Sequence, residues 1–188
     1  MFLFSQGFQV SFFANLLAGL MIALLFFIFK EKVFRIPDIG GVCYLKQITR
    51  STAYNPYKDM ELQYILSLRL EGNKVYGSAE KIYEDSSVGK KEEHVLHYEG
   101  KNRSICKIEG IIQKRYLSCY DILIFQSFEK NQNRKSTTYY SIRLRKKYYL
   151  VGDVLFCNGY FNSTISKQTG TFEMSRDEFY KKDEKYSS

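Results

Sequence analysis

The feature most clearly missing from this sequence of 188 residues is charge before Lys30. All 28 Lys and Arg residues and all 20 Asp and Glu residues lie from that point onward, so an uncharged segment precedes a remainder with a formal net charge of +8. A second long apolar run is absent as well, which excludes a polytopic transporter. The remainder is too apolar for a disordered chain, and its roughly 150 residues suffice for one domain with a core, not for two.

The sequence also lacks the short motifs of common enzymes. No G-x-S-x-G, H-E-x-x-H, Walker A or G-x-G-x-x-G pattern is present. The two histidines, His94 and His97, are three residues apart in a segment expected to be a strand, where such side chains point to opposite faces. We therefore predict that the protein is not an enzyme, and we expect no catalytic residue, no metal site and no bound cofactor.

Paired cysteines are missing too. Four cysteines are present, widely spaced and without a C-x-x-C pair: Cys43, Cys106, Cys119 and Cys157. This spacing is typical of small core residues in a reducing compartment. In an oxidising compartment, the same four could form two disulfides in three possible connectivities.

A single apolar run stands near the start of the chain. Phe8 to Phe29 reads FQVSFFANLLAGLMIALLFFIF, which as a helix reaches roughly 33 Å and can cross a hydrocarbon core of about 30 Å. A cleaved signal peptide would need a basic segment before the run and a small-residue cleavage site after it, but KEKVFR stands there instead. Those cations favour the cytoplasmic side for the C-terminal part of the chain. We predict that residues 1–35 form a single-pass inner-membrane anchor and basic linker, with the N-terminus outside.

Within this run, small and polar residues recur every four positions at Ser11, Asn15, Gly19 and Ala23. This period stacks them on one helix face, where small side chains let two helices approach and an amide can form a hydrogen bond to a neighbour. An unpaired amide in hydrocarbon is costly, by on the order of a few kcal/mol. The pattern predicts a homo-oligomer that packs through this face.

The second part of the chain alternates with a period of two. Apolar and polar residues alternate in Met60–Leu70, as in a half-buried strand. Glu71-Gly72-Asn73-Lys74 has the composition of a β-turn, and Val75–Glu84 resembles the strand that returns after it. Seven further strands are predicted: Val42–Arg50, His94–Glu99, Ile105–Arg115, Ser118–Glu129, Thr137–Leu144, Leu150–Tyr160 and Thr169–Ser175.

About eight serial strands without intervening helices favour an all-β, antiparallel meander that closes into a barrel, because closure removes exposed strand edges. We place this cytoplasmic barrel at residues 36–175, with a charged tail after it at residues 176–188. The strand at Asp121–Phe125 is apolar on both faces, which indicates that a second protomer covers its outer side.

The strongest charge signal is the basic and aromatic stretch from Lys130 to Tyr149. Arg pairs with phosphate through two hydrogen bonds, and Tyr offers a surface on which a base can stack. Three interpretations remain open: a phosphate-containing ligand, anionic lipid headgroups, or a solvated face. Alternation puts Tyr139, Arg143 and Arg145 opposite the apolar side of the strand. As candidate ligand-binding residues we name Tyr139, Arg143, Arg145, Lys147 and Tyr148.

The layout resembles the two-transmembrane β-strand-rich (2TMβ-type) effectors of bacterial anti-phage signalling by cyclic oligonucleotides (CBASS-like). The features concerned are the apolar segment, the link Lys30–Arg35, the entry Ile36-Pro-Asp-Ile-Gly-Gly41, and the pattern Gly159-Tyr-Phe…Gly170-Thr-Phe-Glu-Met. This sequence shows one span where the family has two.

The resemblance implies a cytoplasmic barrel that binds a cyclic nucleotide made by a partner nucleotidyltransferase or polymerase, not a nucleic acid polymer. It further implies oligomers of the membrane segments that disrupt the inner membrane. Either sign of regulation, activation or restraint, is open. The alternative from another class is an anchored lipocalin-like barrel that acts as a ligand carrier or protein adaptor.

Overall fold

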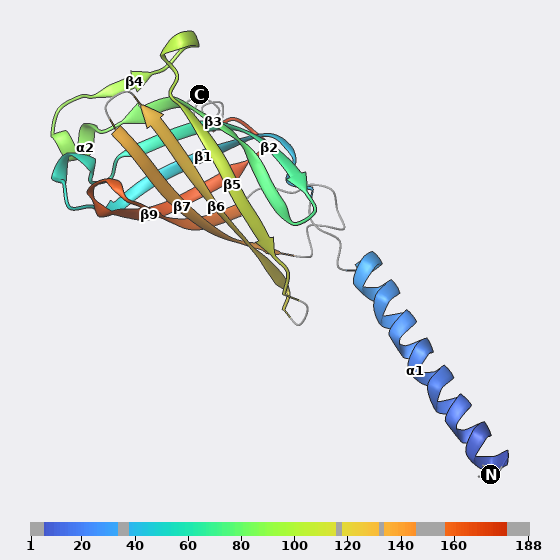
Figure 1. Ribbon diagram of the computed structural model, residues 1–188. Helices are drawn as coiled ribbons and strands as arrows, with labels where there is room; N and C mark the ends of the chain where they lie inside the picture. Colours follow the sequence, from blue (N-terminus) through green and yellow to red (C-terminus); the bar gives the residue numbers. More distant parts are fainter. Residues whose placement is uncertain (1–5, 34–37, 116–117, 132–133, 146–156, 180–188) are drawn as a thin grey trace, which may run out of the picture. The chain divides into compact units, whose positions relative to one another are not determined.

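The structure of the protein is a computed structural model (Figure 1), which describes residues 6–33, 38–115, 118–131, 134–145 and 157–179. The chain divides into two compact units, residues 1–35 and residues 36–188. Among the described residues, the first unit holds one helix and the second holds every strand.

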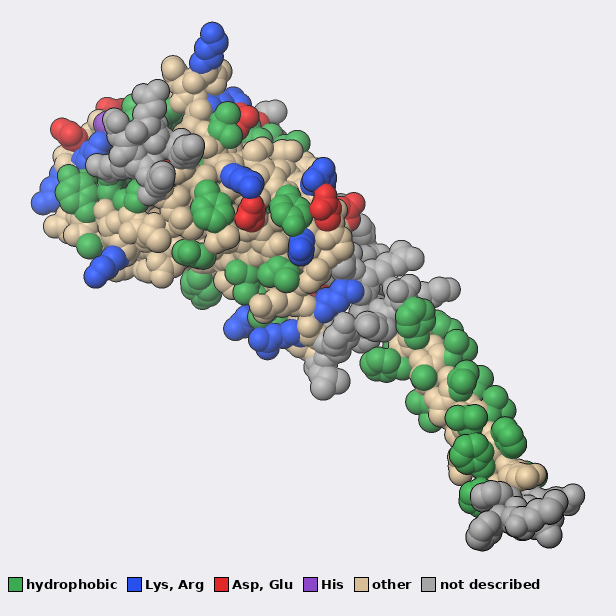
Figure 2. Space-filling model, in the orientation of Figure 1, with side chains coloured by type: hydrophobic (Ala, Val, Ile, Leu, Met, Phe, Trp, Pro, Cys, Tyr) green, Lys and Arg blue, Asp and Glu red, His purple; other side chains and the backbone are tan. Residues whose placement is uncertain are grey.

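The first unit contains α1 (Gln6–Val33), a continuous helix of 28 residues. Its segment Gly7–Phe29 is long and apolar enough to cross a membrane, as the sequence predicts. Side chains along this segment are exposed, and Figure 2 shows hydrophobic ones distributed along the helix. A helix with such a surface is suited to an apolar solvent. The four-residue spacing of Ser11, Asn15, Gly19 and Ala23 places them along one face of it.

Nine strands occur among the described residues of the second unit: β1 (Gly41–Ser51), β2 (Glu61–Glu71), β3 (Lys74–Asp85), β4 (Val95–His97), β5 (Ile105–Gln113), β6 (Tyr120–Asn131), β7 (Arg134–Arg145), β8 (Cys157–Ser163) and β9 (Gln168–Ser175). Short helical turns connect some of them: η1 (Asn55–Tyr57), α2 (Ser87–Lys90), η2 (Gly100–Asn102) and η4 (Ile165–Lys167).

Eight of these strands close into an antiparallel barrel (Figure 1). Within the ring, each strand pairs with the next one along the chain, with β3 pairing with β5 because β4 is not part of the ring. The last strand, β9, pairs with β1 and closes the ring. The ninth, β4, adds three residues to β3 outside the closed ring. The predicted fold class, a meander barrel of about eight strands that follows an apolar helix in the sequence, is therefore confirmed.

The strand boundaries agree closely with the alternation pattern. The predicted turn joins β2, which ends at Glu71, to β3, which begins at Lys74, and Gly72 has the positive φ of 62° that such a turn requires. One predicted strand, Leu150–Tyr160, overlaps β8 only from Cys157 onward, because residues 150–156 lie outside the described part of the chain.

The two ends of the barrel differ in character. We call the end at which β1 begins and β9 ends the chain-entry end, and the opposite end the far end. At the chain-entry end Ile39 is fully buried, and the Arg176 guanidinium donates hydrogen bonds to the carbonyls of Gly40 (2.7 Å) and Val42 (2.8 Å). The first residue after β9 thus fastens the entry of the chain to the barrel, and Phe179 is buried as well.

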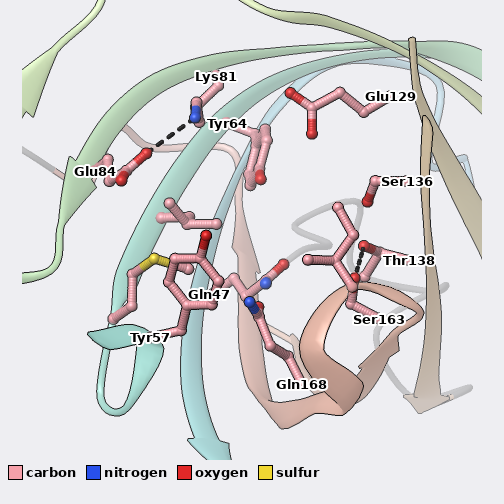
Figure 3. A pocket seen from close by; sticks show the side chains of 13 residues that line it. Gln47, Tyr57, Tyr64, Lys81, Glu84, Glu129, Ser136, Thr138, Ser163 and Gln168 are labelled. Carbon is pink, nitrogen blue, oxygen red and sulfur yellow. Dashed lines mark hydrogen bonds and ion pairs between the residues drawn. The ribbon is translucent and has the colours of Figure 1, made fainter. Parts of the chain in front are cut away.

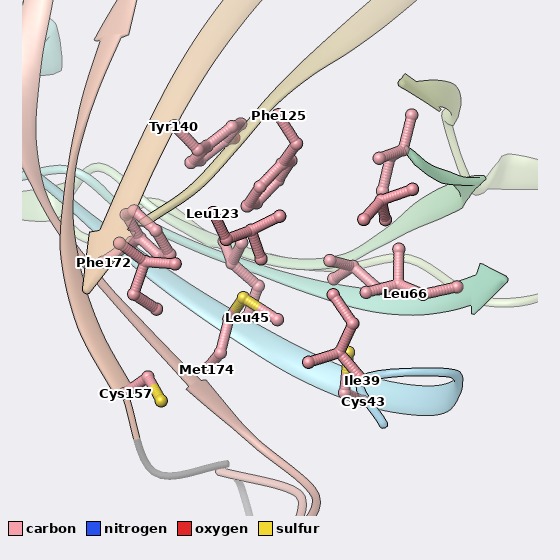
Figure 4. Close-up of a cluster of buried hydrophobic side chains, with 14 of the residues drawn as sticks. Ile39, Cys43, Leu45, Leu66, Leu123, Phe125, Tyr140, Cys157, Phe172 and Met174 are labelled. Carbon is pink, nitrogen blue, oxygen red and sulfur yellow. The ribbon is translucent and has the colours of Figure 1, made fainter. Parts of the chain in front are cut away.

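The half of the barrel next to the chain-entry end is filled by apolar side chains (Figure 4). Its members point inward from alternate positions of facing strands: Cys43, Leu45, Leu66, Leu68, Val75, Ile112, Leu123, Ile142, Leu144, Cys157 and Met174. Burial of this kind stabilises a fold by about 1.5–3 kcal/mol for each large side chain. These side chains form the apolar core of the barrel.

A layer of aromatic rings crosses the middle of the barrel. Phe125 and Tyr140 stack with their ring centroids 4.6 Å apart, and Phe172 meets Tyr140 edge-on at 5.1 Å. Phe172 lies directly across from Gly159, where an added Cβ would come within 2.5 Å of the ring. Glycine at this position makes room for the ring, which gives one half of the Gly159…Gly170 pattern a packing role.

Three of the four cysteines agree with the expected core position, and one does not. Cys43, Cys106 and Cys157 are buried and free, whereas Cys119 is exposed. The expectation was wrong for Cys119 because it lies in the connection between β5 and β6, outside the alternating part of either strand.

Candidate functional site

A pocket of about 210 Å³ opens at the far end of the barrel, and Figure 3 shows the side chains that line it. Several of the barrel strands supply polar groups to it from their inward faces. Its lining consists of Gln47, Tyr57, Met60, Leu62, Tyr64, Lys81, Glu84, Glu129, Ser136, Thr138, Ser163, Ile165 and Gln168. The volume is below the roughly 300–1,000 Å³ of a typical site for a drug-sized molecule. It suits a small ligand or one part of a larger one.

The floor of the pocket is joined to the aromatic layer by a buried hydrogen bond. The Tyr140 hydroxyl donates to Gln47 Oε1 at 2.8 Å. Burial raises the pKa of Tyr140 and also that of Tyr64 well above the usual value, so both hydroxyls stay protonated. Since Tyr140 occupies the amide oxygen, Gln47 presents its amide as a fixed polar group at the bottom of the site.

A backbone irregularity positions the charged groups of the pocket. Gln63 pairs with Tyr83 while Tyr64 pairs with Lys81, so Ile82 is an extra residue in β3 at this point. Strict alternation would put Lys81 and Glu84, three residues apart, on opposite faces. The bulge shifts the alternation by one residue, and both side chains enter the barrel.

Lys81 and Glu84 form an ion pair inside the pocket, with Nζ and Oε2 3.0 Å apart. The Tyr98 hydroxyl donates to the same carboxylate oxygen at 3.0 Å. Burial alone would lower the pKa of Lys81 and raise that of Glu84. The opposite charge of the partner outweighs burial in both cases, so the pKa of Lys81 is raised and that of Glu84 is lowered. Both groups are therefore charged at neutral pH.

A second carboxylate, Glu129 on β6, lines the pocket and accepts a hydrogen bond from the Ser104 hydroxyl. Two carboxylates thus face one ammonium group among the described lining residues, and that ammonium is already paired with Glu84. An anion entering the pocket itself would be repelled. Groups that carry N–H donors would be attracted.

The remaining walls carry neutral donors and acceptors. The Thr138 hydroxyl donates to Ser163 Oγ at 3.1 Å, and Gln168 adds a second amide. Thr49 comes after Gln47 on the inward face of β1, and its fully buried hydroxyl has no hydrogen-bond partner among the described residues. These walls can form several hydrogen bonds with a polar group, next to the apolar side chains of Met60, Leu62 and Ile165.

The cationic stretch singled out in the sequence runs along β7 and is divided between the two barrel ends. Lys130 pairs with Lys135 and Asn131 pairs with Arg134 in the β6–β7 hairpin at the far end. Arg143 and Arg145 lie at the other end of β7, where Arg145 pairs with Tyr120. The backbone of the hairpin therefore lies at the far end of β7, and Arg143 and Arg145 lie toward the chain-entry end.

The structure brings only part of the predicted ligand-binding set together. Tyr139, Arg143 and Arg145 are exposed on the outer face of β7, while Tyr140, Ile142 and Leu144 fill the interior. None of these three outward residues lines the pocket. Lys147 and Tyr148 lie outside the described residues. The assignment of a phosphate ligand to this set stays a prediction.

The pocket residues themselves are not among those that the sequence patterns single out. A signal was present in β1, where the inward row runs from Cys43 and Leu45 to the polar Gln47 and Thr49. A row that changes from apolar to polar toward one end indicates a polar barrel end. The inward position of Glu84 had no such signal, since it depends on the bulge.

Fold and site together define a class of protein: a closed antiparallel barrel with an apolar core in one half and one open polar end, in a chain that also has a helix of membrane-spanning length. No protein family model, curated protein or solved structure matches this chain.

Proposed function

We propose that this protein is a membrane-anchored effector whose barrel senses a cyclic nucleotide at the far-end pocket. In this proposal α1 anchors the chain in the inner membrane and self-associates through Ser11, Asn15, Gly19 and Ala23. Ligand occupancy controls that association and so the disruption of the membrane during anti-phage defence. A partner nucleotidyltransferase or polymerase supplies the ligand. The observation that carries the proposal is a polar pocket at one end of a barrel with an apolar core.

The pocket favours the base of a nucleotide over its phosphates. The edges of the bases present N–H donors and carbonyl or ring-nitrogen acceptors. Carboxylates such as Glu129 accept from the donors, the Gln47 amide N–H groups donate to the acceptors, and the Gln168 amide can do both. Phosphates would be repelled by the two carboxylates and would remain outside the pocket, at the end of the barrel where Lys130 and Arg134 occur in the sequence of the β6–β7 hairpin.

The test is a melting experiment on the full-length protein in detergent, with a panel of cyclic mono-, di- and trinucleotides. A ligand at 100 times its Kd stabilises a protein by about 2.7 kcal/mol. We expect one member of the panel to raise the melting temperature by several degrees. Gln168→Ala should weaken this shift through the pocket, and Lys130→Glu with Arg134→Glu should weaken it from outside the pocket.

The matched control is Arg143→Glu with Arg145→Glu, which makes a double charge reversal of the same kind at the opposite end of β7. The proposal requires a normal ligand response from this variant. Loss of the response there would move the ligand to the outer face of β7. A panel without any active nucleotide, together with expression that leaves membrane permeability unchanged, would exclude the sensor function altogether.

One observation favours a second candidate, an anchored protein adaptor. A groove of about 410 Å³ on the outer face of β3, β5, β6 and β7 is lined mainly by apolar groups, among them Tyr76, Ile111, Ile124 and Tyr139. It lies over the strand that is apolar on both faces. Ile124→Lys should abolish capture of a partner by an adaptor, but should not alter a nucleotide response in the pocket.

A further inference from the structure

The outer side of the barrel over β5, β6, β7 and β8 exposes apolar and aromatic side chains. Ile111 on β5 is 39% exposed, Tyr139 on β7 is 49% exposed and Tyr160 on β8 is 74% exposed. In Figure 1 the strands β5, β6 and β7 lie side by side on the near side of the barrel, and Figure 2 shows hydrophobic and charged side chains together on that side. Exposed tyrosines next to apolar groups are typical of surfaces that bind a protein.

Strand register arranges these side chains in two rows that cross the four strands. The first row, ordered from β5 to β8 with each residue paired to the next, is Ile111, Ile124, Ser141 and Tyr160. The second row, in the same order, is Glu109, Gln126, Tyr139 and Asn162. We call these eight residues the β5–β8 face.

One side of the β5–β8 face is hollow, and the other side projects. The groove of about 410 Å³ is lined by residues of β3, β5, β6 and β7, among them Ile111 and Ile124, and its lining includes no residue of β8. Tyr160 stands on β8 beside the groove and is largely exposed. Ser141, which is exposed between Ile124 and Tyr160, has a small side chain. A hollow and a projection on one surface allow that surface to fit a second copy of itself.

A two-fold axis that runs along the strands between β6 and β7 brings hollow and projection together. In such a symmetric interface β5 of one copy faces β8 of the other, and β6 faces β7. Tyr160 of each copy then enters the groove of the other over Ile111, while Ile124 meets Ser141. Because Ser141 is small, it leaves room for Ile124 when the two sheets pack at their usual separation of about 10 Å.

The same axis pairs the polar groups of the second row. Asn162 comes opposite Glu109, and Tyr139 comes opposite Gln126. An amide N–H donates to a carboxylate, and a phenol and an amide can each donate and accept. Glu109 also forms an ion pair with Lys107, with Oε1 and Nζ 2.6 Å apart, and its carboxylate can accept further hydrogen bonds. Glu109 is the only charged residue of the eight, so no like charges meet across the two rows.

We propose that the β5–β8 face is an interface between two copies of the barrel. A single symmetry operation matches hollow with projection in one row and donor with acceptor in the other. This inference does not rest on the proposed self-association of α1 and goes beyond it, because it gives the barrel an interface of its own. It also assigns the groove to a second copy, where an adaptor would hold a different protein.

Crosslinking between two variants of the full-length protein in detergent tests the proposal. Both variants carry Cys119→Ser, because Cys119 is the only exposed cysteine of the four. One variant carries Ile111→Cys, the other carries Tyr160→Cys, and the two have different affinity tags and are produced in the same cells. The reagent is a bis-maleimide that spans about 10 Å, the separation of two packed sheets.

We expect a covalent dimer that contains both tags, and little or no dimer from either variant produced alone. Two copies of Ile111, or two copies of Tyr160, would be displaced along the face by three strand spacings, about 14 Å, in addition to the separation of the sheets. The reagent cannot bridge that distance.

A substitution at the centre of the face provides the second measurement. Ser141→Arg in both variants should lower the yield of the mixed dimer several-fold, because it places a long charged side chain against Ile124 of the other copy. Ser67→Arg, at an exposed serine of β2, is the matched control and should leave the yield unchanged. Equal melting temperatures of the variants establish that they are folded.

Each other result contradicts the interface. Absence of the mixed dimer, when both new cysteines react with a monofunctional maleimide, would overturn it. Strong crosslinking of Ile111→Cys to itself, or a mixed dimer that survives Ser141→Arg, would show that the copies associate through another surface such as α1. Crosslinking to a different protein in place of a second copy would assign the groove to the partner of an adaptor.

Discussion

At the scale of single residues, the pocket depends on one extra residue in β3. The bulge at Ile82 turns both Lys81 and Glu84 into the barrel, where each holds the other in its charged form. Their side chains are 18% and 17% exposed, so water screens the pair only partly. Tyr98 adds a hydrogen bond from outside the eight-stranded ring. The charge pattern of the site therefore depends on local backbone geometry.

This pair predicts a specific dependence of stability on pH. The pKa of Glu84 is lowered on folding, so its contribution is complete above the ordinary carboxyl value of 4.5 and is lost as the pH falls through the folded value. Glu84→Gln should lower the free energy of unfolding by about 1–2 kcal/mol at neutral pH, because it leaves Lys81 half-buried without its partner. Chemical denaturation at several pH values measures the difference.

The gap between the wild-type protein and Glu84→Gln should be constant above pH 4.5 and should shrink as the pH falls below that value through the lowered pKa of Glu84, because the wild-type carboxylate then becomes protonated. Toward alkaline pH the raised pKa of Lys81 keeps the pair intact past 10.5, and the contribution disappears only as the pH rises through the folded value. Glu71→Gln, which breaks the exposed pair of Arg69 and Glu71, is the control and should change little. A gap that stays constant over the whole acidic range would contradict the role given to the ion pair.

At the scale of secondary-structure elements, α1 and β7 each combine two features of the sequence. The composition of α1 suits an apolar solvent, and the four-residue spacing places its small residues along one face of the helix. Because β7 runs the length of the barrel, its two groups of cations, Arg134 with Lys135 and Arg143 with Arg145, belong to opposite ends of the strand. One continuous stretch of sequence thereby serves two separate surfaces.

The face of α1 predicts the behaviour of one substitution. If α1 self-associates as proposed, Asn15→Leu should leave membrane insertion unchanged but weaken the association, because it removes the amide that would form the interhelical hydrogen bond. That bond is worth on the order of 1 kcal/mol in a membrane. Oligomer size in detergent, measured by light scattering or crosslinking, is the readout. Leu17→Ala alters the opposite face and should have no effect; an Asn15→Leu protein of unchanged size would contradict the packing face.

At the scale of the whole molecule, the closed barrel is a self-sufficient unit. The eight strands of the closed ring leave no open edge, and the short β4 pairs with β3 outside that ring. Among the described residues, the core of the barrel contains no side chain of α1. The chain-entry end is fastened by Arg176 and Ile39, which both belong to the same unit. The described core of the barrel is therefore formed by residues of the second unit.

Residues 36–188 alone are accordingly expected to fold. A protein that lacks residues 1–35 should be soluble, show the circular dichroism of a β protein and unfold in one cooperative transition. It should retain any ligand-induced rise in melting temperature, whereas membrane permeabilisation on expression should be lost. Aggregation of this shortened protein, or a non-cooperative transition, would show that the barrel requires α1.

The sequence by itself determined the apolar helix and the order of the strands, because local periodicity and the absence of charge before Lys30 can be read along the chain. It predicted the closure of the barrel, which is made by pairing of β1 with β9. It also indicated where the positive charge is concentrated. Only the tertiary structure decided that this charge is divided between the two ends and that Lys81 and Glu84 face each other inside. Strand register and a single bulge set those positions, and both result from pairing between strands that are distant in sequence.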